Sequence, residues 1–359
     1  MINTSTQYGK LKKVIVGNEL NFNKRLFDIT MKNFYKENLG QQLYDSPITE
    51  YSINYKILQE RIEDLDTLSS TLINLGIDVS RPTKVDKMHR IETPYFKSEG
   101  SSASNVRDLT FIYNNTIIET PVFIRNRYFE NLQLYSILNK NFFETPERFN
   151  PKWIKSPNNF LTESRIDLDN WDSPRNFENL NPIIDTYDMA IDAAQFIKIN
   201  DKECFVNIST YNHYLGFLWV KSNFPNITFY PLYQLIDNHL DGAFNILSDG
   251  VFLVNPAYRN LKEKLPKKFK NWKYLIPKET IRKYPTNVTD IDKLFASERG
   301  MDINVLSISP KQVIVSKDAT ETIKILEKNN FEAIPIQLRH SEIFAGGIHC
   351  STLDIERDS

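Results

Sequence analysis

The C-terminal tail carries the residues best suited to chemistry, with Gly346 and Gly347 shortly before Cys350. Glycine tolerates φ > 0 and lets the backbone approach another group closely, so this pair can direct the following side chain into a cleft. Cys350 is one of only two cysteines in the chain. Two interpretations are open at this point: a nucleophilic thiol, or a buried cysteine that packs as a small hydrophobic residue.

Carboxylates recur at places equivalent to that of the thiol. Each member of the set lies at or near the start of a predicted strand: Asp108, Asp192, Asp241, Asp302 and Cys350. One such carboxylate is ordinarily a turn residue, but a recurrent one indicates that the side chains converge if the strands surround a common axis. His239 lies two residues before Asp241 and adds an acid/base group.

Acids around a thiol suppress its ionisation unless the substrate brings positive charge. A guanidinium stays protonated at any relevant pH, and its fork of N–H donors suits two carboxylates. Its binding neutralises the acids and favours the thiolate of Cys350, while a histidine protonates the leaving amine and a further acid orients the imidazole. His239 is the best candidate for that histidine. We expect His349 to point away, because adjacent strand residues face opposite sides.

The elements that must position these residues form an internal repeat. Four units, each a β-hairpin followed by a helix and a strand, are predicted to begin at residues 108, 192, 241 and 302. Their turns contain residues that suit tight hairpins. The tail resembles the opening of a fifth hairpin, whose partner is the strand predicted at residues 11–17. Such a ring removes exposed sheet edges; the alternative is a linear α/β sheet with coincidental hairpins.

Two other segments have distinct patterns. Residues 53–75 show apolar spacing of three and four, which predicts an amphipathic helix ending at Gly76. Residues 139–189 lack clean periodicity and contain several prolines together with Trp153 and Trp171. An irregular stretch of this length in a compact domain is usually functional or mobile, and its aromatic residues argue against disorder. We interpret it as a partly ordered loop or lid over the cleft.

Composition excludes several classes of function. A formal net charge of −1 gives no electrostatic case for a nucleic acid or an anionic membrane as partner. Two cysteines cannot form a disulfide framework and indicate a reducing compartment, so we expect a cytoplasmic protein. Because the predicted strand begins so early, we expect no cleavable signal. Neither a metal-binding pattern nor an apolar run of membrane-spanning length is present in the sequence.

Several short motifs follow one another along the whole chain: Leu11-Lys-Lys-Val-Ile-Val-Gly17, Val106-Arg107-Asp108, Ile118-Glu-Thr-Pro121, Asp192-Ala-Ala-Gln-Phe196, His239-Leu-Asp241, Asn255-Pro256, Asn304-Val305 and Gly346-Gly-Ile-His-Cys350. In these motifs the chain resembles the amidinotransferases, which move an amidino group from arginine to an amine. The resemblance implies an α/β fold, the five-bladed α/β propeller (pentein) of ββαβ modules with fivefold pseudosymmetry, as one domain over residues 1–359. It implies no metal and no organic cofactor; a homodimer is an assembly that it allows.

The same resemblance assigns chemical roles. Cys350 resembles the nucleophile that becomes a covalent amidino-cysteine, His239 the acid/base, and Asp192 the acid that orients it. Asp108 and Asp241 resemble the pair that grips the guanidinium.

Departures from the family pattern concern the edges of the cleft. Arg259 is a candidate for binding the arginine carboxylate, although it lies one place later than the family's arginine. Gln195 replaces a second acid, and Ala345 replaces the first of three glycines. Asn238, in a shorter loop than that of the glycine enzyme, is a candidate for the acceptor side. A polar residue there favours an acceptor larger than glycine, with a hydroxyl or a second amine.

Three functions remain in competition at this point. The leading one is L-arginine:amine amidinotransferase activity, with ornithine as the released product. The second is hydrolysis by a related arginine deiminase, in which water attacks the intermediate; Asp192-Ala-Ala-Gln195 favours transfer, because deiminases tend to carry Glu-Gly-Gly-Asp there. The third is a catalytically silent binding protein on the same fold, which the joint presence of the candidate residues disfavours.

Overall fold

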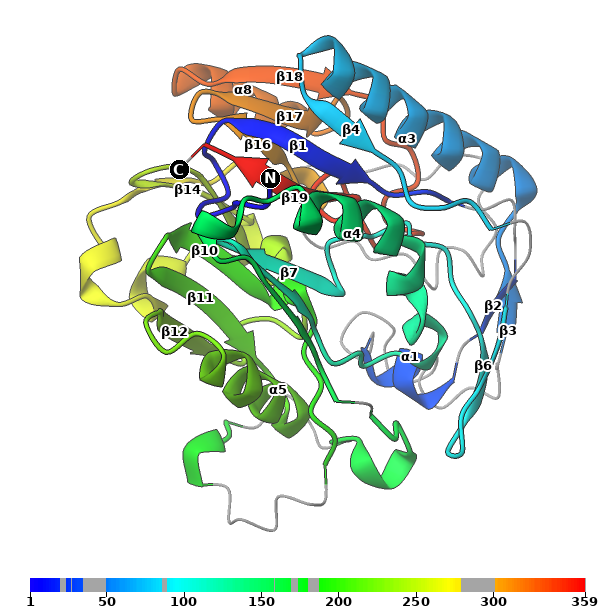
Figure 1. Ribbon diagram of the computed structural model, residues 1–359. Coiled ribbons are helices and arrows are strands. Elements are labelled where there is room, and N and C mark those ends of the chain that lie inside the picture. The colour runs from blue at the N-terminus through cyan, green and yellow to red at the C-terminus, as the bar shows by residue number, and fades with distance from the viewer. Residues whose placement is uncertain are drawn as a thin grey trace.

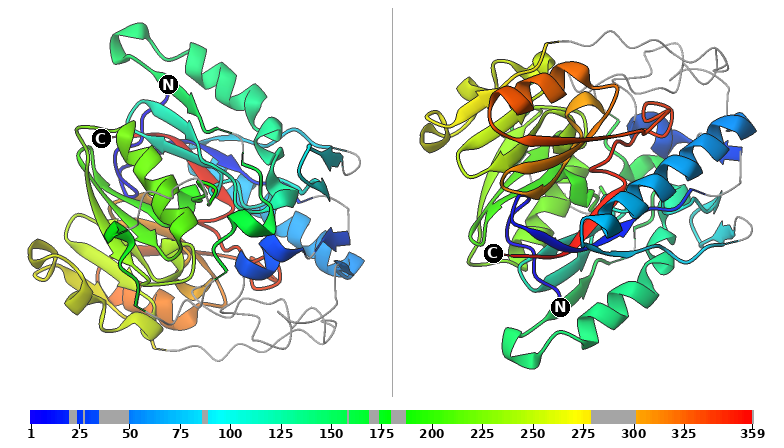
Figure 2. Two further views of the ribbon diagram at one scale, coloured as in Figure 1. Left: turned by 90° about the horizontal axis from the view of Figure 1, so that it is seen from below. Right: turned by 90° about the horizontal axis from the view of Figure 1, so that it is seen from above.

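The computed structural model describes residues 1–19, 24–26, 28–34, 50–85, 89–157, 159–168, 174–179, 187–278 and 301–358. Within them lie five three-stranded sheets, each an antiparallel hairpin extended by a parallel third strand. Figures 1 and 2 show the sheets side by side, with the longer helices on the outside. This is the ββαβ arrangement that the repeat predicted.

Each sheet and its helix form one module. Module 1 consists of β7 (Thr110–Tyr113), β8 (Thr116–Glu119), α4 (Tyr135–Phe143) and β9 (Lys152–Lys155). Module 2 consists of β10 (Phe196–Asn200), β11 (Glu203–Ile208), α5 (Tyr211–Ser222) and β12 (Thr228–Tyr233). Module 3 consists of β13 (Phe244–Ser248), β14 (Val251–Val254), α6 (Leu261–Lys264) and β15 (Lys273–Leu275). Module 4 consists of β16 (Leu306–Ser309), β17 (Gln312–Ser316), α8 (Thr320–Lys328) and β18 (Glu332–Ile336). Module 5 consists of β19 (Thr352–Arg357), β1 (Leu11–Val16), α3 (Tyr55–Asn74) and β4 (Asp78–Ser80).

Short elements decorate the modules. Two small hairpins are formed by β2 (Lys24–Leu26) with β3 (Glu50–Ser52) and by β5 (Arg90–Glu92) with β6 (Lys97–Glu99). Helix α1 spans Ile29–Phe34. Among the 3-10 helices, three precede the first strands of modules: η7 (Ala193–Gln195), η8 (Leu240–Gly242) and η11 (Met301–Ile303).

The two ends of the chain close the ring. Strand β19 pairs antiparallel with β1, with Asp354 opposite Val14 and Thr352 opposite Val16. Strand β4 then pairs parallel with β1. The C-terminal strand therefore opens module 5 and the N-terminal strand completes its hairpin, as the sequence predicted. That residues 1–359 form one domain stays a prediction.

The hydrophobic core is divided among the interfaces between neighbouring modules. Five clusters of buried residues each combine side chains of two modules, and together they cover all five interfaces. Between modules 2 and 3, for example, Phe205 packs with Phe244 and Phe252. A sheet with neighbours on both faces must be apolar on both, which is why every residue of β7 and β8 is buried.

Helix α3 shows how sequence pattern becomes structure here. Asn54 accepts a hydrogen bond from the Lys56 N–H at 2.9 Å and caps the helix start. Leucines spaced by three or four, such as Leu65, Leu68 and Leu72, are fully buried. Gly76 follows the helix with φ of +79°. The helix predicted over residues 53–75 is confirmed.

Module 1 corrects one expectation. Two 3-10 turns precede its helix α4, which begins at Tyr135. Strand β9 contains Trp153 and completes the module, although residues 139–189 were expected to be irregular. Its four residues were overlooked because Pro151 and Pro157 bracket so short a strand. Trp171 and Pro182 lie outside the described residues, and the lid stays a prediction.

No helix in the described part of the chain is long and apolar enough to cross a membrane.

Candidate active site

The repeat places its special residues just ahead of strands. Strands β7, β10, β13, β16 and β19 begin at Thr110, Phe196, Phe244, Leu306 and Thr352. The four acids and Cys350 therefore precede their strands by two to four residues. Most lie in or beside 3-10 turns, which aim them toward the mouth of the ring and not along a pleated sheet face.

Cys350 lies in a tight turn that packs too closely for side chains at two positions. A Cβ atom on Gly346 would come within 2.0 Å of Asn105 Oδ1, and one on Gly347 within 2.5 Å of Asn304 Oδ1. The Ser351 N–H donates to the Gly347 carbonyl at 3.1 Å, which closes the turn. The glycines are needed for close approach, as expected from the sequence.

The side-chain amide of Asn304 holds Cys350 in place, with its nitrogen beside the thiol and its oxygen bound to the backbone of the turn. Its Nδ2 lies 3.2 Å from Cys350 Sγ and 3.1 Å from Asp241 Oδ2. Its Oδ1 accepts from the backbone N–H groups of His349 and Cys350, at 2.9 and 3.2 Å. In the sequence, this asparagine stood out only as part of a motif. The available signal was its position two residues after Asp302, near the start of module 4, from which it contacts Cys350.

His349 is a correction to the sequence prediction. Its Nδ1 lies 2.7 Å from Asp241 Oδ2, the same oxygen that Cys350 Sγ approaches at 3.5 Å. The rule of alternating faces failed because residues 348–351 form a turn, and β19 begins only at Thr352. Burial and the charge of Arg107 lower the pKa of His349, so its neutral ring donates to Asp241.

His239 lies between two acids. Its Nε2 is 2.9 Å from Asp192 Oδ2, and its Nδ1 is 3.8 Å from Asp108 Oδ1. Burial alone lowers the pKa of His239, but the Asp108 charge and the hydrogen bond to Asp192 outweigh it and raise the pKa well above its usual value. The imidazole is therefore protonated at neutral pH. It also makes a hydrogen bond with Cys350.

The carboxylate of Asp108 is held on one side only. Arg127 Nη1 donates to its Oδ2 at 2.6 Å, while the buried Oδ1 has no hydrogen-bond partner among the described residues. Burial raises the pKa of Asp108, against the opposing charges of His239 and Arg127. A buried oxygen without a donor indicates a place for a ligand N–H.

The carboxylate of Asp241 lies beside the thiol. Within the described residues, its side-chain contacts with His349, Asn304 and Cys350 all end on Oδ2. Burial raises its pKa, but the hydrogen bond from His349 and the charge of His239 lower it to about 2. Asp241 is therefore ionised.

The resting thiol is protonated. Burial raises the pKa of Cys350 to about 11, Asp241 and Asp108 add to this effect, and the hydrogen bond from His239 opposes it. A cation placed among these acids reverses the balance. Cys204, by contrast, is buried in the core cluster between modules 1 and 2 and carries no such neighbours.

Gln195 holds Asp192 in position by hydrogen bonding and adds no negative charge of its own. The Gln195 Oε1 accepts from the Asp192 N–H at 2.9 Å, and its Nε2 donates to the Asn207 carbonyl at 2.9 Å. The Asn207 amide in turn donates to the carbonyl of Asn238 at 2.8 Å. This chain of bonds joins η7 to the loop before His239.

Three candidates lie at the margin of the constellation. Asn238 is buried, and its backbone is held by Asn207 and Asp237. Arg259 is exposed, and its Nε donates to the Pro256 carbonyl at 3.1 Å. Asp302 is partly buried on η11. The binding roles of Asn238 and Arg259 stay predictions.

The described residues contain no group of three or more histidine, cysteine and acidic side chains that could hold a metal ion. Cys350, His239, Asp192, Asp108 and Asp241 do come together, and their arrangement suits a cationic planar group beside a thiol.

Known proteins with similar sequences are amidinotransferases. Glycine amidinotransferase of Xenopus laevis is 27% identical over 367 residues, covering 98% of this chain and 82% of the relative. Inosamine-phosphate amidinotransferase 1 of Streptomyces griseus is 27% identical over 359 residues, covering 99% and 97%. No family model matches the chain. Over nearly its whole length, this chain is similar to amidinotransferases.

Solved structures agree with the amidinotransferase-like assignment at the level of the fold. The Streptomyces griseus inosamine-phosphate enzyme superposes with a TM-score of 0.82 at 24% identity, covering 100% of this chain and 97% of that chain. An amidinotransferase of Microseira wollei from saxitoxin biosynthesis gives 0.77 at 24% identity, covering 100% and 98%. A dimethylarginine dimethylaminohydrolase gives 0.53 at 10% identity, covering 96% and 99%. The pentein fold that the resemblance implied is confirmed.

Proposed function

We propose that this amidinotransferase-like protein transfers the amidino group of L-arginine to an acceptor amine through Cys350, in a ping-pong reaction that releases ornithine. The observation that carries the proposal is the buried Asp108 Oδ1, which has no hydrogen-bond partner among the described residues, together with the ionised carboxylate of Asp241 beside Cys350 Sγ. A guanidinium supplies two N–H groups and one positive charge to such a pair.

Arginine binding prepares the nucleophile. The cation compensates Asp108 and Asp241, which otherwise raise the pKa of Cys350. The thiol proton leaves to solvent, and Asn304 Nδ2 donates to the sulfur. The enzyme thus ionises its cysteine only when the substrate is in place.

The first half-reaction forms the covalent intermediate. The thiolate of Cys350 attacks the guanidinium carbon, forming a C–S bond and a neutral tetrahedral species. His239 gives its proton to the ornithine nitrogen as the C–N bond breaks. Ornithine leaves, and the amidino group stays on sulfur as a cation beside Asp108 and Asp241.

The second half-reaction reverses these roles. The nitrogen of the acceptor amine attacks the amidino carbon, and neutral His239 takes its extra proton. The C–S bond breaks, the guanidino product leaves, and the thiolate of Cys350 returns. Asp192 orients the imidazole in both steps through its contact with Nε2.

The decisive experiment is mass spectrometry of the purified protein mixed with L-arginine. We expect an amidino adduct on Cys350 and one equivalent of ornithine before any acceptor is added. Citrulline and ammonia without an acceptor would indicate the deiminase reaction instead. No adduct and no turnover with any amine would leave the binding-protein interpretation.

The proposal includes a cytoplasmic location and small-molecule partners only. Both cysteines are buried free thiols, which suits a reducing compartment. The balanced net charge of −1 supports the absence of a nucleic-acid partner.

A further inference from the structure

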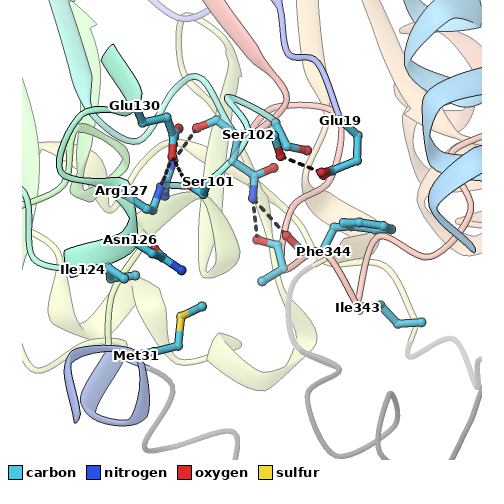
Figure 3. Close-up of a pocket in the computed structure, with 13 residues that line it drawn as sticks. Glu19, Met31, Ser101, Ser102, Ile124, Asn126, Arg127, Glu130, Ile343 and Phe344 are labelled. Atoms are coloured by element: carbon cyan, nitrogen blue, oxygen red, sulfur yellow. Dashed lines mark hydrogen bonds and ion pairs between the residues drawn. The ribbon is translucent and has the colours of Figure 1, made fainter. Parts of the chain in front are cut away.

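A polar pocket lies beside Asp108, with a volume of about 100 Å³. Figure 3 shows polar side chains at one end and Met31, Ile124 and Ile343 toward the other. Its lining includes Glu19, Ser104, Asn105, Asn126, Arg127 and Glu130. Whole small-molecule sites are several times larger, so this one has room for the far end of a substrate.

The pocket adjoins the nucleophile turn through two of its walls. Arg127 reaches from the pocket to Asp108 Oδ2 at 2.6 Å. On the other side, the Asn105 Nδ2 donates to the Phe344 carbonyl at 3.0 Å, and its Oδ1 packs on Gly346. Atoms that line the pocket therefore contact both the guanidinium-binding acid and the turn that carries Cys350.

The single cation of the lining is already committed. Arg127 donates from Nε and Nη2 to both oxygens of Glu130, each at 2.7 Å. Its Nη1 binds Asp108, and Nη2 also donates to the Asn105 carbonyl at 3.0 Å. Four N–H directions of this side chain thus have acceptors, and two acids, Glu19 and Glu130, line the same pocket. A carboxylate placed here would meet the like charge of Glu19 and Glu130, and the charge of Arg127 is already shared between Glu130 and Asp108.

Acceptor oxygens, by contrast, are in excess. Ser104 Oγ, Asn105 Oδ1 and Asn126 Oδ1 are buried and have no hydrogen-bond partner among the described residues. Ser104 and Asn126 are each only 7% exposed. The two amide oxygens need a donor, and the Ser104 hydroxyl can accept one hydrogen bond while it donates another. The lining as a whole therefore suits a ligand rich in O–H or N–H groups.

We infer that this pocket receives the far end of the acceptor amine, and that it selects acceptors with additional hydroxyl or amino groups over acceptors with a carboxylate. The inference rests on the proposed transfer reaction. Small reorientations of Ser104 and Asn126 bring their unpaired oxygens onto the donor groups of the acceptor, while Arg127 keeps Asp108 in place for the amidino group.

The test separates the two half-reactions. Wild-type protein is first loaded with arginine, and the adduct on Cys350 is confirmed by mass spectrometry. Loaded protein is then mixed with 3-amino-1,2-propanediol, 1,3-diaminopropane, propylamine, β-alanine and glycine, and decay of the adduct is timed. We expect the diol and the diamine to react fastest, propylamine more slowly, and the two carboxylates slowest.

Variants of the pocket identify its contribution. Ser104→Ala and Asn126→Ala should each lower kcat/KM for the diol by about three- to tenfold, the range of one hydrogen bond. Propylamine and arginine loading should keep wild-type rates. Ser70→Ala and Asn74→Ala, on the exposed side of α3, serve as matched controls. Melting curves of all four variants identify any loss of folding.

The outcomes are distinguishable. Glycine or β-alanine reacting fastest, or pocket variants that match their controls with every acceptor, would overturn the inference alone. Variants that raise the KM for arginine and leave the acceptor step unchanged would assign the pocket to arginine instead, which also overturns it. Failure of wild-type protein to form the adduct would overturn the proposed function and this inference together.

Discussion

Asp354 and Asp108 are both buried carboxylates that contact an arginine, but their charges are compensated to different degrees. Asp354 is 1% exposed and accepts from Arg107 at one oxygen and from Arg357 at the other, each at 2.8 Å. Asp108 is 2% exposed and receives one such bond, from Arg127, while its second oxygen has no hydrogen-bond partner among the described residues and only a longer ion pair with His239 at 3.8 Å. The two acids are linked through the chain, because Arg107, which donates to Asp354, directly precedes Asp108.

Their pKa values respond accordingly. Burial would raise the pKa of Asp354, but Arg107, Arg357 and Lys198 lower it well below the usual range. Burial raises the pKa of Asp108 despite its partners. We conclude that a fully paired buried acid is part of the scaffold, whereas a buried acid with one free oxygen marks the place where a cationic substrate completes the charge balance.

The largest effect is expected for Cys350→Ser. A hydroxyl of similar size is a far weaker nucleophile without a strong base, so turnover should fall by about 10³-fold or more, or about 4 kcal/mol of barrier. Steady-state kinetics with arginine and an amine measures this, and chemical denaturation should show intact folding. Cys204→Ala is the control, since that thiol lies in the core. Activity of Cys350→Ser within about tenfold of wild type would exclude the covalent route.

Asp108→Asn and Asp241→Asn should separate binding from folding. Each leaves a bound guanidinium half compensated, which costs about 3–5 kcal/mol if the pair is desolvated. The loss should appear in adduct formation with arginine, before any acceptor is present. Normal adduct formation in both variants would show that these acids do not grip arginine. Because burial disfavours the charge of Asp108, its variant should keep a wild-type free energy of unfolding.

Asp354→Asn should instead affect the stability of the fold. It leaves Arg107 and Arg357 buried without their counter-charge, so the free energy of unfolding should fall by about 3–5 kcal/mol. The folded pKa of Asp354 lies below its unfolded value of about 3.9, so the stability it adds is present above that pH and is lost as pH falls below it. Urea titrations from pH 3 to 7 should show a shallower acid dependence in the variant. An unchanged dependence would mean that Asp354 is not the scaffold acid.

The reactivity of the Cys350 thiol should report the negative charge that surrounds it. With a pKa of about 11, Cys350 should be alkylated by iodoacetamide at a rate that still rises from pH 7 to pH 10. Asp241→Asn removes one of the charges that raise this pKa, so alkylation at pH 7.5 should quicken by about tenfold per unit of pKa while amidino transfer is lost. Slower alkylation in the variant would contradict the electrostatic account.

The smallest effect is expected for Asn304→Ala. Loss of the Nδ2 contact to sulfur removes one hydrogen bond to the thiolate, so arginine loading should slow by about threefold to thirtyfold. Alkylation of Cys350 should slow in parallel, a change that simple loosening of the turn would not produce. Asn329→Ala, at the end of α8, is a matched control.

Local patterns in the sequence determined most of the architecture. Turn residues marked the hairpins, apolar spacing marked α3, and the tail at Cys350 was recognisable as a strand in need of a partner. These features depend on neighbours within a few residues, which is why they can be read without coordinates. Strand β9 was missed because four residues between prolines carry too little periodicity to distinguish a strand from a loop.

Tertiary structure alone decided which groups touch. His349 reaches Asp241 because a turn replaces the strand expected at Cys350, and Asn304 reaches the thiol because Gly347 leaves space for its amide. The protonation states were also undecided by sequence, because a pKa depends on burial and on charges brought together by ring closure. The residue types were fixed in the chain, but their shared chemistry required the five modules to bring one end of each to a common mouth.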